Sequence, residues 1–210
     1  MNHNIFLVGI IMNNIKRDIE LLFEIGCFRY LQRTWKRFFN PDVQNNAEHT
    51  LRVIWIALTL ARYEKIGNEE KIIKMALIHD LGESRAGDVD YISRQYTKRY
   101  ETKAIKDILK QTVHEKELIK LYKDYEKREN IESKIVKDAD NLDVELELVE
   151  QEFRGHKMGI IWNKVRFQKV YPKLYTKTAK RFWQEIHKTN PQSWHLNAQN
   201  RFNAGDWKKK

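Results

Sequence analysis

Residues 69–83 read Glu-Glu-Lys-Ile-Ile-Lys-Met-Ala-Leu-Ile-His-Asp-Leu-Gly-Glu. Apolar side chains occur on nearly every side of a helix drawn through residues 72–78, which is typical of a helix at the centre of a bundle. Asn68 is a suitable N-cap because its side chain can accept a hydrogen bond from the first helical turn. This helix ends at His79-Asp80, and burying that carboxylate costs several kcal/mol, unless it is paired or binds a metal.

The helical pattern continues on both sides of this stretch. Apolar residues spaced i, i+3, i+4 and i+7 predict a helix over residues 46–65, and Gly67 is placed to end it. Other amphipathic segments predict helices around residues 15–26, 97–113, 116–128, 131–148 and 172–187, with a loop at 87–90. Alternating strand patterns and hairpin turns are absent, so the sequence predicts one all-α domain, a helical bundle over residues 13–190.

Composition excludes several other classes. The chain has 210 residues, of which 41% are hydrophobic and 11% aromatic, so a disordered coil is excluded. Cys27 is the single cysteine, so no disulfide can form within the chain, and we expect a cytoplasmic protein. The apolar run at residues 5–12 is too short to cross a bilayer, so we expect no membrane span. Met12 offers a second possible start, so we expect residues 1–12 to be an N-terminal extension.

Positive charge is concentrated near the C-terminus. The net charge is +10, yet the first 153 residues hold 25 basic and 27 acidic side chains, whereas the last 57 hold 14 and 2. We therefore expect a basic C-terminal helical extension ending in a basic tail at 191–210. Basic residues interleaved with aromatic rings could bind nucleic acid, although a solvated helix face over core aromatics is the favoured interpretation. The charge could also steer a phosphorylated substrate toward the protein.

Polar residues inside apolar helices are the candidates for chemistry. His49 lies near the start of one predicted helix, His79-Asp80 ends another, and Asp140 precedes the apolar stretch at 144–148 of a third. Two imidazoles and two carboxylates suit a single divalent metal ion of intermediate softness, namely manganese, cobalt, nickel, iron or zinc.

Four windows occur in a particular order: Ala47-Glu48-His49-Thr50, Met75 to Glu83, Gly87-Asp88 and Lys137-Asp138-Ala139-Asp140. Together they resemble the HD-domain metal-dependent phosphohydrolases, and most of all the 5'-deoxynucleotidase group, over about residues 18–190. The resemblance implies an all-α HD-domain bundle. It also implies an enzyme that releases phosphate from nucleoside 5'-monophosphates, with a preference for the 2'-deoxy ones, and that forms a homodimer.

When the family's motifs are matched to this sequence position by position, the resemblance also implies which residues form the site. Asp140 rather than Asp138 matches the metal-binding acid, Glu83 matches the catalytic glutamate, and Asp88 matches an acid that positions water and sugar. Arg33 and Trp35 match residues that contact the substrate. The family's usual Arg-Thr-Gly-Trp is represented here by Arg33-Thr34-Trp35, which is one glycine shorter. The implied metal ligands are His49, His79, Asp80 and Asp140.

Two alternatives remain open from the sequence. Another branch of the same family could act on a different phosphorylated nucleotide. However, alarmone hydrolases have Glu-Asp where this chain has Glu83-Ser84, and triphosphohydrolases carry a further histidine after the glycine. The second alternative is a nucleic-acid-binding helical module in which the metal is structural.

Overall fold

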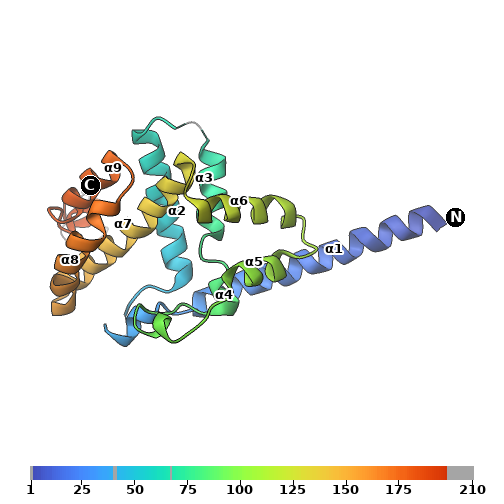
Figure 1. The fold of residues 1–210 in the computed structure, drawn as a ribbon, viewed down its shortest axis with the longest axis horizontal. Helices are drawn as coiled ribbons and strands as arrows, with labels where there is room; N and C mark the ends of the chain where they lie inside the picture. Colours follow the sequence, from blue (N-terminus) through green and yellow to red (C-terminus); the bar gives the residue numbers. More distant parts are fainter. Residues whose placement is uncertain (1, 40–41, 67, 198–210) are drawn as a thin grey trace, which may run out of the picture.

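The computed structural model describes residues 2–39, 42–66 and 68–197, and Figure 1 shows how their helices are arranged. Regular structure in these residues is helical, apart from one isolated bridge between Gln32 and Asn45, which confirms the all-α fold. The helices are α1 (Asn2–Cys27), α2 (Asn46–Tyr63), α3 (Glu69–Ile78), α4 (Glu83–Ala86), α5 (Glu101–Leu109), α6 (Glu115–Lys127), α7 (Ile131–Phe153), α8 (Lys157–Lys169), α9 (Lys177–Ile186) and α10 (Ser193–Leu196). Short 3-10 turns lie at η1 (Phe28–Tyr30), η2 (Thr34–Arg37), η3 (Ser93–Gln95) and η4 (Tyr171–Lys173).

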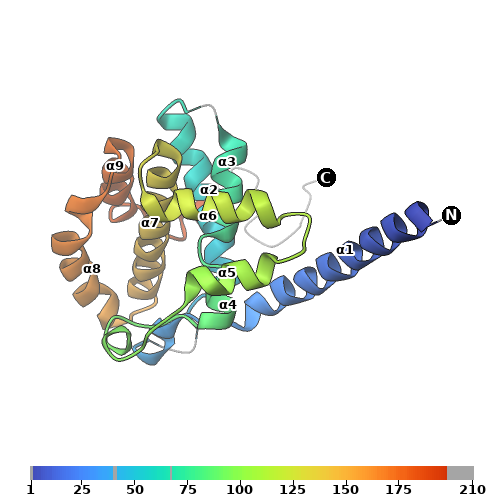
Figure 2. The ribbon, with the colours of Figure 1, turned by 45° about the vertical axis from the view of Figure 1, so that its right-hand side comes forward.

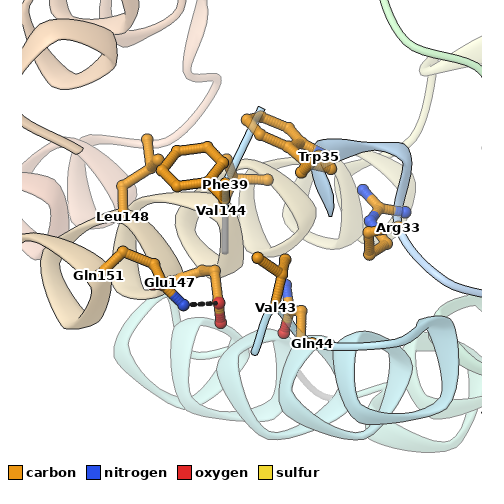
Figure 3. Close-up of a pocket in the computed structure, with 9 residues that line it drawn as sticks. All are labelled: Arg33, Trp35, Phe39, Val43, Gln44, Val144, Glu147, Leu148 and Gln151. Atoms are coloured by element: carbon orange, nitrogen blue, oxygen red, sulfur yellow. Dashed lines mark hydrogen bonds between the residues drawn. The ribbon is translucent and has the colours of Figure 1, made fainter. Parts of the chain in front are cut away.

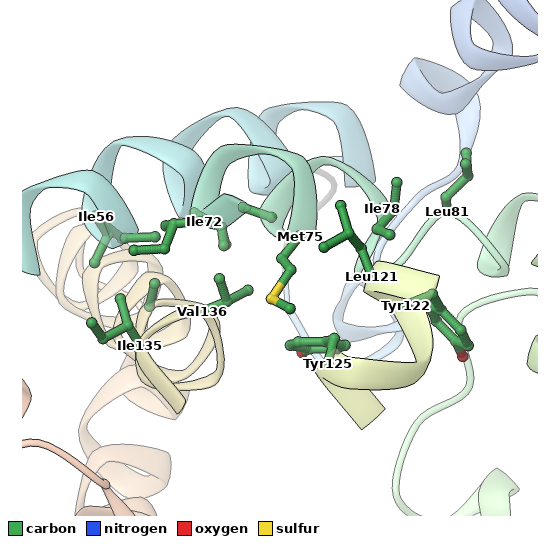
Figure 4. Close-up of a cluster of buried hydrophobic side chains, with 14 of the residues drawn as sticks. Ile56, Ile72, Met75, Ile78, Leu81, Leu121, Tyr122, Tyr125, Ile135 and Val136 are labelled. Carbon is green, nitrogen blue, oxygen red and sulfur yellow. The ribbon is translucent and has the colours of Figure 1, made fainter. Parts of the chain in front are cut away.

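The centre of the bundle is formed by α2, α3 and α7, which pack against one another, with α6 laid across α3 and α7. Figure 4 shows Met75 of α3 beside Tyr125 of α6 and Val136 of α7, all of them buried. The expectation that residues 69–78 form a central helix is therefore confirmed. Burying the side chains of this core stabilises the fold by about 25 cal/mol for each Å² of apolar surface removed from water. This burial is the main stabilising contribution.

Two asparagine caps start the helices that carry the site. Asn45 accepts hydrogen bonds from the backbone N–H groups of Ala47 and Glu48, and Glu48 returns a bond to the Asn45 N–H, which completes a capping box. Asn68 accepts from the N–H of Lys71 and begins α3 as its sequence predicts. Replacing such a cap by alanine typically costs about 1 kcal/mol.

Helix α1 extends away from the rest of the molecule in both Figure 1 and Figure 2. Leu21 is buried, but the predicted apolar face remains open to solvent, with Leu22 and Phe23 exposed at 59% and 74%. The helix is tied to α5 by Arg17, which donates to the carbonyls of Ile108 and Lys110. The expected residue 1–12 extension overlaps this helix, and its boundary stays a prediction.

The basic region after residue 154 differs in detail from the pattern predicted. Residues 172–187 do not form one helix, because Pro172 lies in η4 and an extended step at Leu174 separates this turn from α9. The backbone N–H groups of Tyr175 and Thr176 donate instead to Asp138 on α7, and Thr176 then caps α9. Helix α8 was missed because its apolar residues run consecutively as Ile160-Ile161-Trp162 rather than along one face.

Helices α8 and α9 pack against α7, and Trp183 of α9 is buried in the main core. None of the helices in residues 2–39, 42–66 and 68–197 has both the length and the apolar character needed to cross a bilayer. Most of the predicted basic tail, residues 198–210, lies outside the described residues.

Candidate active site

The implied metal ligands come together from two helices, α2 and α7, and from the turn after α3. The Nε2 atoms of His49 on α2 and His79 after α3 are 3.2 Å apart, and one donor atom from each lies within 4.8 Å of a carboxylate oxygen of Asp140 on α7. Asp80 Oδ2 lies 3.4 Å from Nε2 of each histidine, and Asp140 Oδ1 is 3.4 Å from Nε2 of His49. Four potential ligands therefore surround one point.

The other ring nitrogen of each histidine is already engaged. His79 Nδ1 lies 2.8 Å from the carbonyl oxygen of Ala76, which can only accept, so this nitrogen carries the hydrogen. His49 Nδ1 faces the carboxylate of Asp143 in the same way. In the neutral rings, both Nε2 atoms then point lone pairs at each other across 3.2 Å, beside two carboxylates. A cation between the rings makes this donor set favourable, so the residues fit a divalent metal.

Asp138 and Asp140 differ sharply in their surroundings, although both lie on α7. Asp138 is completely buried and accepts bonds of 2.8 Å from the N–H groups of Tyr175 and Thr176 and one of 2.9 Å from the Thr176 hydroxyl. Asp140 faces the histidines and pairs with Lys137 at 2.6 Å. Burial alone would raise the pKa of Asp140, but Lys137 and both histidines hold that pKa well below its usual range. Asp138, by contrast, connects α7 to the segment before α9 through its hydrogen bonds.

Glu83 begins α4 and is buried beside the metal ligands. Its Oε2 accepts a 2.6 Å bond from Asn46 Nδ2, and Arg99 Nη1 lies 3.3 Å from its Oε1. Burial raises the pKa of Glu83 to about 8, and the negative charges of Asp80 and Asp88 act in the same direction. This carboxyl is therefore held close to the implied metal ligands, with a pKa raised toward the neutral range.

Arg33 lies over the same cluster of acids. Its Nη1 is 3.2 Å from Asp80 Oδ2 and 3.8 Å from Glu83 Oε2. Its Nε is buried and has no hydrogen-bond partner among the described residues, the oxygen of Asp88 being 3.7 Å away. Asp88 itself is held by the backbone N–H and hydroxyl of Thr34, at 2.9 and 3.2 Å. A buried guanidinium with an unsatisfied N–H is a suitable group for binding an anion.

Two hollows adjoin Arg33. One is a small cavity of about 10 Å³ lined by apolar residues such as Phe39 and Leu148, with room for about one water molecule (Figure 3). The other is an open pocket of about 250 Å³, whose walls include Arg33, Asp88 and the rings of Trp35 and Trp162. The centroids of these two tryptophan rings are 4.6 Å apart. Of these two hollows, the open pocket is the one large enough to hold part of a small molecule.

The structure thus brings together every site residue that the sequence singled out, although their roles stay predictions. It also adds residues that the sequence reasoning missed. Asn46 directly precedes the Ala47-Glu48-His49 window, and Asp143 lies one helical turn after Asp140, so helical spacing could have indicated both. Arg99 lies in a loop sixteen residues after Glu83, and no local pattern signals its contact.

Comparison with known proteins agrees with this geometry. The family model for the HD domain matches residues 25–187. A 5'-deoxynucleotidase HDDC2 of Dictyostelium discoideum is 32% identical over 158 residues, which cover 70% of this chain and 82% of that protein. The human protein of the same name is 30% identical over 147 residues, covering 67% and 71%.

Among solved structures, a conserved hypothetical protein of Pyrococcus furiosus superposes with a TM-score of 0.67 at 28% identity. The superposition covers 81% of this chain and 99% of that one. A match over most of the helical bundle, together with a convergent histidine and aspartate cluster, leads to one conclusion. The chain belongs to the HD domain family.

Proposed function

We propose that the protein is a metal-dependent phosphohydrolase that releases orthophosphate from nucleoside 5'-monophosphates, with a preference for 2'-deoxyribose. The observation that carries this proposal is the cluster of His49, His79 and Asp140 donor atoms within 4.8 Å of one another. Arg33, with its unsatisfied buried Nε, lies over the same cluster. The relatives named 5'-deoxynucleotidase, at 30–32% identity over at least two thirds of this chain, support the choice of substrate.

His49, His79, Asp80 and Asp140 would hold one divalent cation. Mixed nitrogen and oxygen ligands suit manganese, cobalt, nickel, iron or zinc. When bound, such a cation offsets negative charge on phosphoryl oxygens and makes nearby water more acidic.

Glu83 serves as the general base in this proposal. Asn46 Nδ2 fixes one of its oxygens through the 2.6 Å bond, so the carboxylate keeps a constant direction beside the ligands. Glu83 takes a proton from the attacking water as the water oxygen bonds to phosphorus. The bond from phosphorus to O5' breaks, the leaving alkoxide gains a proton, and the products are orthophosphate and a nucleoside. Positioned general bases typically contribute a factor of about 10²–10⁴ in rate.

Arg33 and the open pocket beside it bind the substrate. The Arg33 Nε–H would donate to a phosphoryl oxygen, which satisfies a polar group that otherwise lacks a partner. Asp88 is fixed by Thr34 and faces the same pocket, where its carboxylate can accept from a sugar hydroxyl. Trp35 lines the pocket and offers an apolar surface to the sugar and base.

The test is product analysis on a panel of nucleotides with Mn²⁺ or Co²⁺ added. We expect orthophosphate from 5'-monophosphates, with the 2'-deoxy compounds hydrolysed faster than their ribose counterparts. Pyrophosphate from an alarmone, or triphosphate from a nucleoside triphosphate, would instead assign the chain to another branch of the family. If metal is bound and no nucleotide is hydrolysed, the proposal is wrong.

Two further expectations accompany this proposal. We expect a homodimer, which light scattering after size-exclusion chromatography measures directly. We also expect the protein in the cytoplasm, where nucleoside monophosphates are present and Cys27, which is exposed, remains reduced.

A further inference from the structure

One buried carboxylate near the site has no part in the reaction proposed above. Asp143 lies on α7, one turn after Asp140, and is completely inaccessible to solvent. Its Oδ2 lies 2.5 Å from His49 Nδ1 and 2.6 Å from Gln44 Nε2, and its Oδ1 accepts from Arg52 Nε. Removing a carboxylate from water costs several kcal/mol unless its partners compensate, so this arrangement calls for an explanation.

The carboxylate of Asp143, which two other side chains hold in place, determines which His49 nitrogen carries hydrogen. Gln44 and Arg52 both direct N–H groups at the carboxylate, which can only accept. A lone pair on His49 Nδ1 would repel the carboxylate oxygen, whereas an N–H there forms a hydrogen bond. The neutral ring therefore keeps its hydrogen on Nδ1. The lone pair on Nε2 is then directed at His79 Nε2, 3.2 Å away.

Asp143 cannot easily turn away from this position because Arg52 is held on its far side. Arg52 Nη1 lies 2.9 Å from Glu150 Oε1, and its Nη2 lies 3.2 Å from Glu147 Oε2. Arg52 Nη2 also donates to Gln44 Oε1 at 3.1 Å, so the two donors to Asp143 are linked to each other. The support for the carboxylate thus comes from both α2 and α7.

The two histidines obtain their orientation from different sources. His79 Nδ1 bonds to the carbonyl of Ala76, three residues earlier, so a backbone group at the end of α3 orients this ring nitrogen. His49 lies in the first turn of α2 and relies on Asp143 from another helix. A carboxylate behind a metal-binding imidazole fixes the ring and raises its basicity.

We propose that Asp143 is a positioning residue of the metal site, which holds His49 so that Nε2 is directed at the metal ion. This proposal rests on the metal site of the proposed function and is independent of which nucleotide is hydrolysed. Asp143 does not touch the substrate or the ion. Its effect is transmitted through the His49 ring and is supported by Arg52.

The test uses Asp143→Asn in the full chain, with Asp138→Asn as the matched control. Arg52 Nε would attract the new amide oxygen, which leaves the amide NH₂ facing His49 Nδ1. That nitrogen must then accept, so the hydrogen moves to Nε2 and blocks the metal position. We expect Zn²⁺ affinity, measured by titration without nucleotide, to fall by about 10–100-fold. Asp138→Asn removes an equally buried charge from the same helix and should leave Zn²⁺ affinity within about threefold, since Asp138 accepts its hydrogen bonds from the segment before α9.

A measurement on the unaltered chain keeps the proposal testable even if Asp143→Asn does not fold. In the Zn²⁺-loaded protein, ¹⁵N NMR should show a hydrogen on His49 Nδ1 that exchanges slowly with water. A folded Asp143→Asn variant with unchanged Zn²⁺ affinity would overturn the proposal. So would an equal loss of affinity in Asp138→Asn, or a His49 ring without hydrogen on Nδ1. Because no nucleotide is present, these results are separate from any failure to detect phosphate release.

Discussion

Replacing Asp138 and Asp140 by alanine, one at a time, should give two different kinds of damage from positions two residues apart. Asp138 accepts from two backbone N–H groups, those of Tyr175 and Thr176, and is fully buried. Asp140 pairs with Lys137, whose side chain is 38% exposed, and faces the two histidines. We therefore expect Asp138→Ala to reduce stability and Asp140→Ala to reduce metal binding.

The size of the stability loss in each variant follows from the hydrogen-bond donors that the variant leaves without a partner. A buried donor without a partner costs about 1–3 kcal/mol, so losing both backbone partners of Asp138 costs about 2–6 kcal/mol. Since domains are stable by only about 5–15 kcal/mol, this is a large fraction of the total. In Asp140→Ala, the Lys137 ammonium can turn to water, so we expect a change in stability of about 1 kcal/mol or less.

Urea unfolding with a chelator present measures the stability of both variants, and titration with Mn²⁺ measures their affinity for metal. We expect Asp138→Ala to unfold at much lower urea yet bind Mn²⁺ like the unaltered chain wherever it is folded. Asp140→Ala should unfold near the original midpoint and lose at least tenfold in affinity. The reasoning is refuted if folded Asp138→Ala loses the metal while Asp140→Ala retains it.

Three other changes test separate parts of the account. Glu83→Gln should retain bound metal and lose about 10²–10⁴-fold in phosphate release, as measured by steady-state kinetics; unchanged kinetics would exclude Glu83 as the base. Gly159→Ala should lower stability by about 1–3 kcal/mol in thermal unfolding, because its Cβ would lie 2.7 Å from the carbonyl oxygen of Leu148; an unchanged midpoint would contradict this packing. Glu24→Gln should lower the free energy of unfolding by under about 1 kcal/mol at pH 7. Arg85 lowers the pKa of Glu24 from 4.5, so the contribution of Glu24 to stability is fully present above pH 4.5 and is lost as pH falls through the lowered pKa. A stability difference that does not shrink as pH falls from 4.5 would count against the ion pair.

Much of the fold could be predicted because the signals are local. The apolar positions of α2 and α3 and their asparagine caps lie within a few turns of one another, so helix period and capping chemistry indicate both helices. The break before α9 could not be predicted in this way. It depends on Asp138, which lies 38 residues before Thr176 and competes for backbone N–H groups that a helix would otherwise use.

The candidate site shows the same division between local and distant signals. His79 and Asp80 are adjacent and end an apolar helix, so their position alone indicates a buried polar cluster. Arg99 reaches Glu83 only because the chain after α4 folds back over it, and nothing in the nearby sequence indicates that contact. Physical reasoning from the sequence therefore indicates the candidate ligands more readily than the side chains that support them.

The most direct test of the central claim is a titration of the chelator-stripped protein with Co²⁺, in which orthophosphate release from 2'-deoxyadenosine 5'-monophosphate is followed at each addition. We predict no release without metal and full release at about one ion per chain, since the donor atoms of His49, His79 and Asp140 form a single cluster within 4.8 Å of one another. Release that needs no metal would contradict the account, and so would a protein that binds the ion at His49 and His79 yet leaves the nucleotide intact.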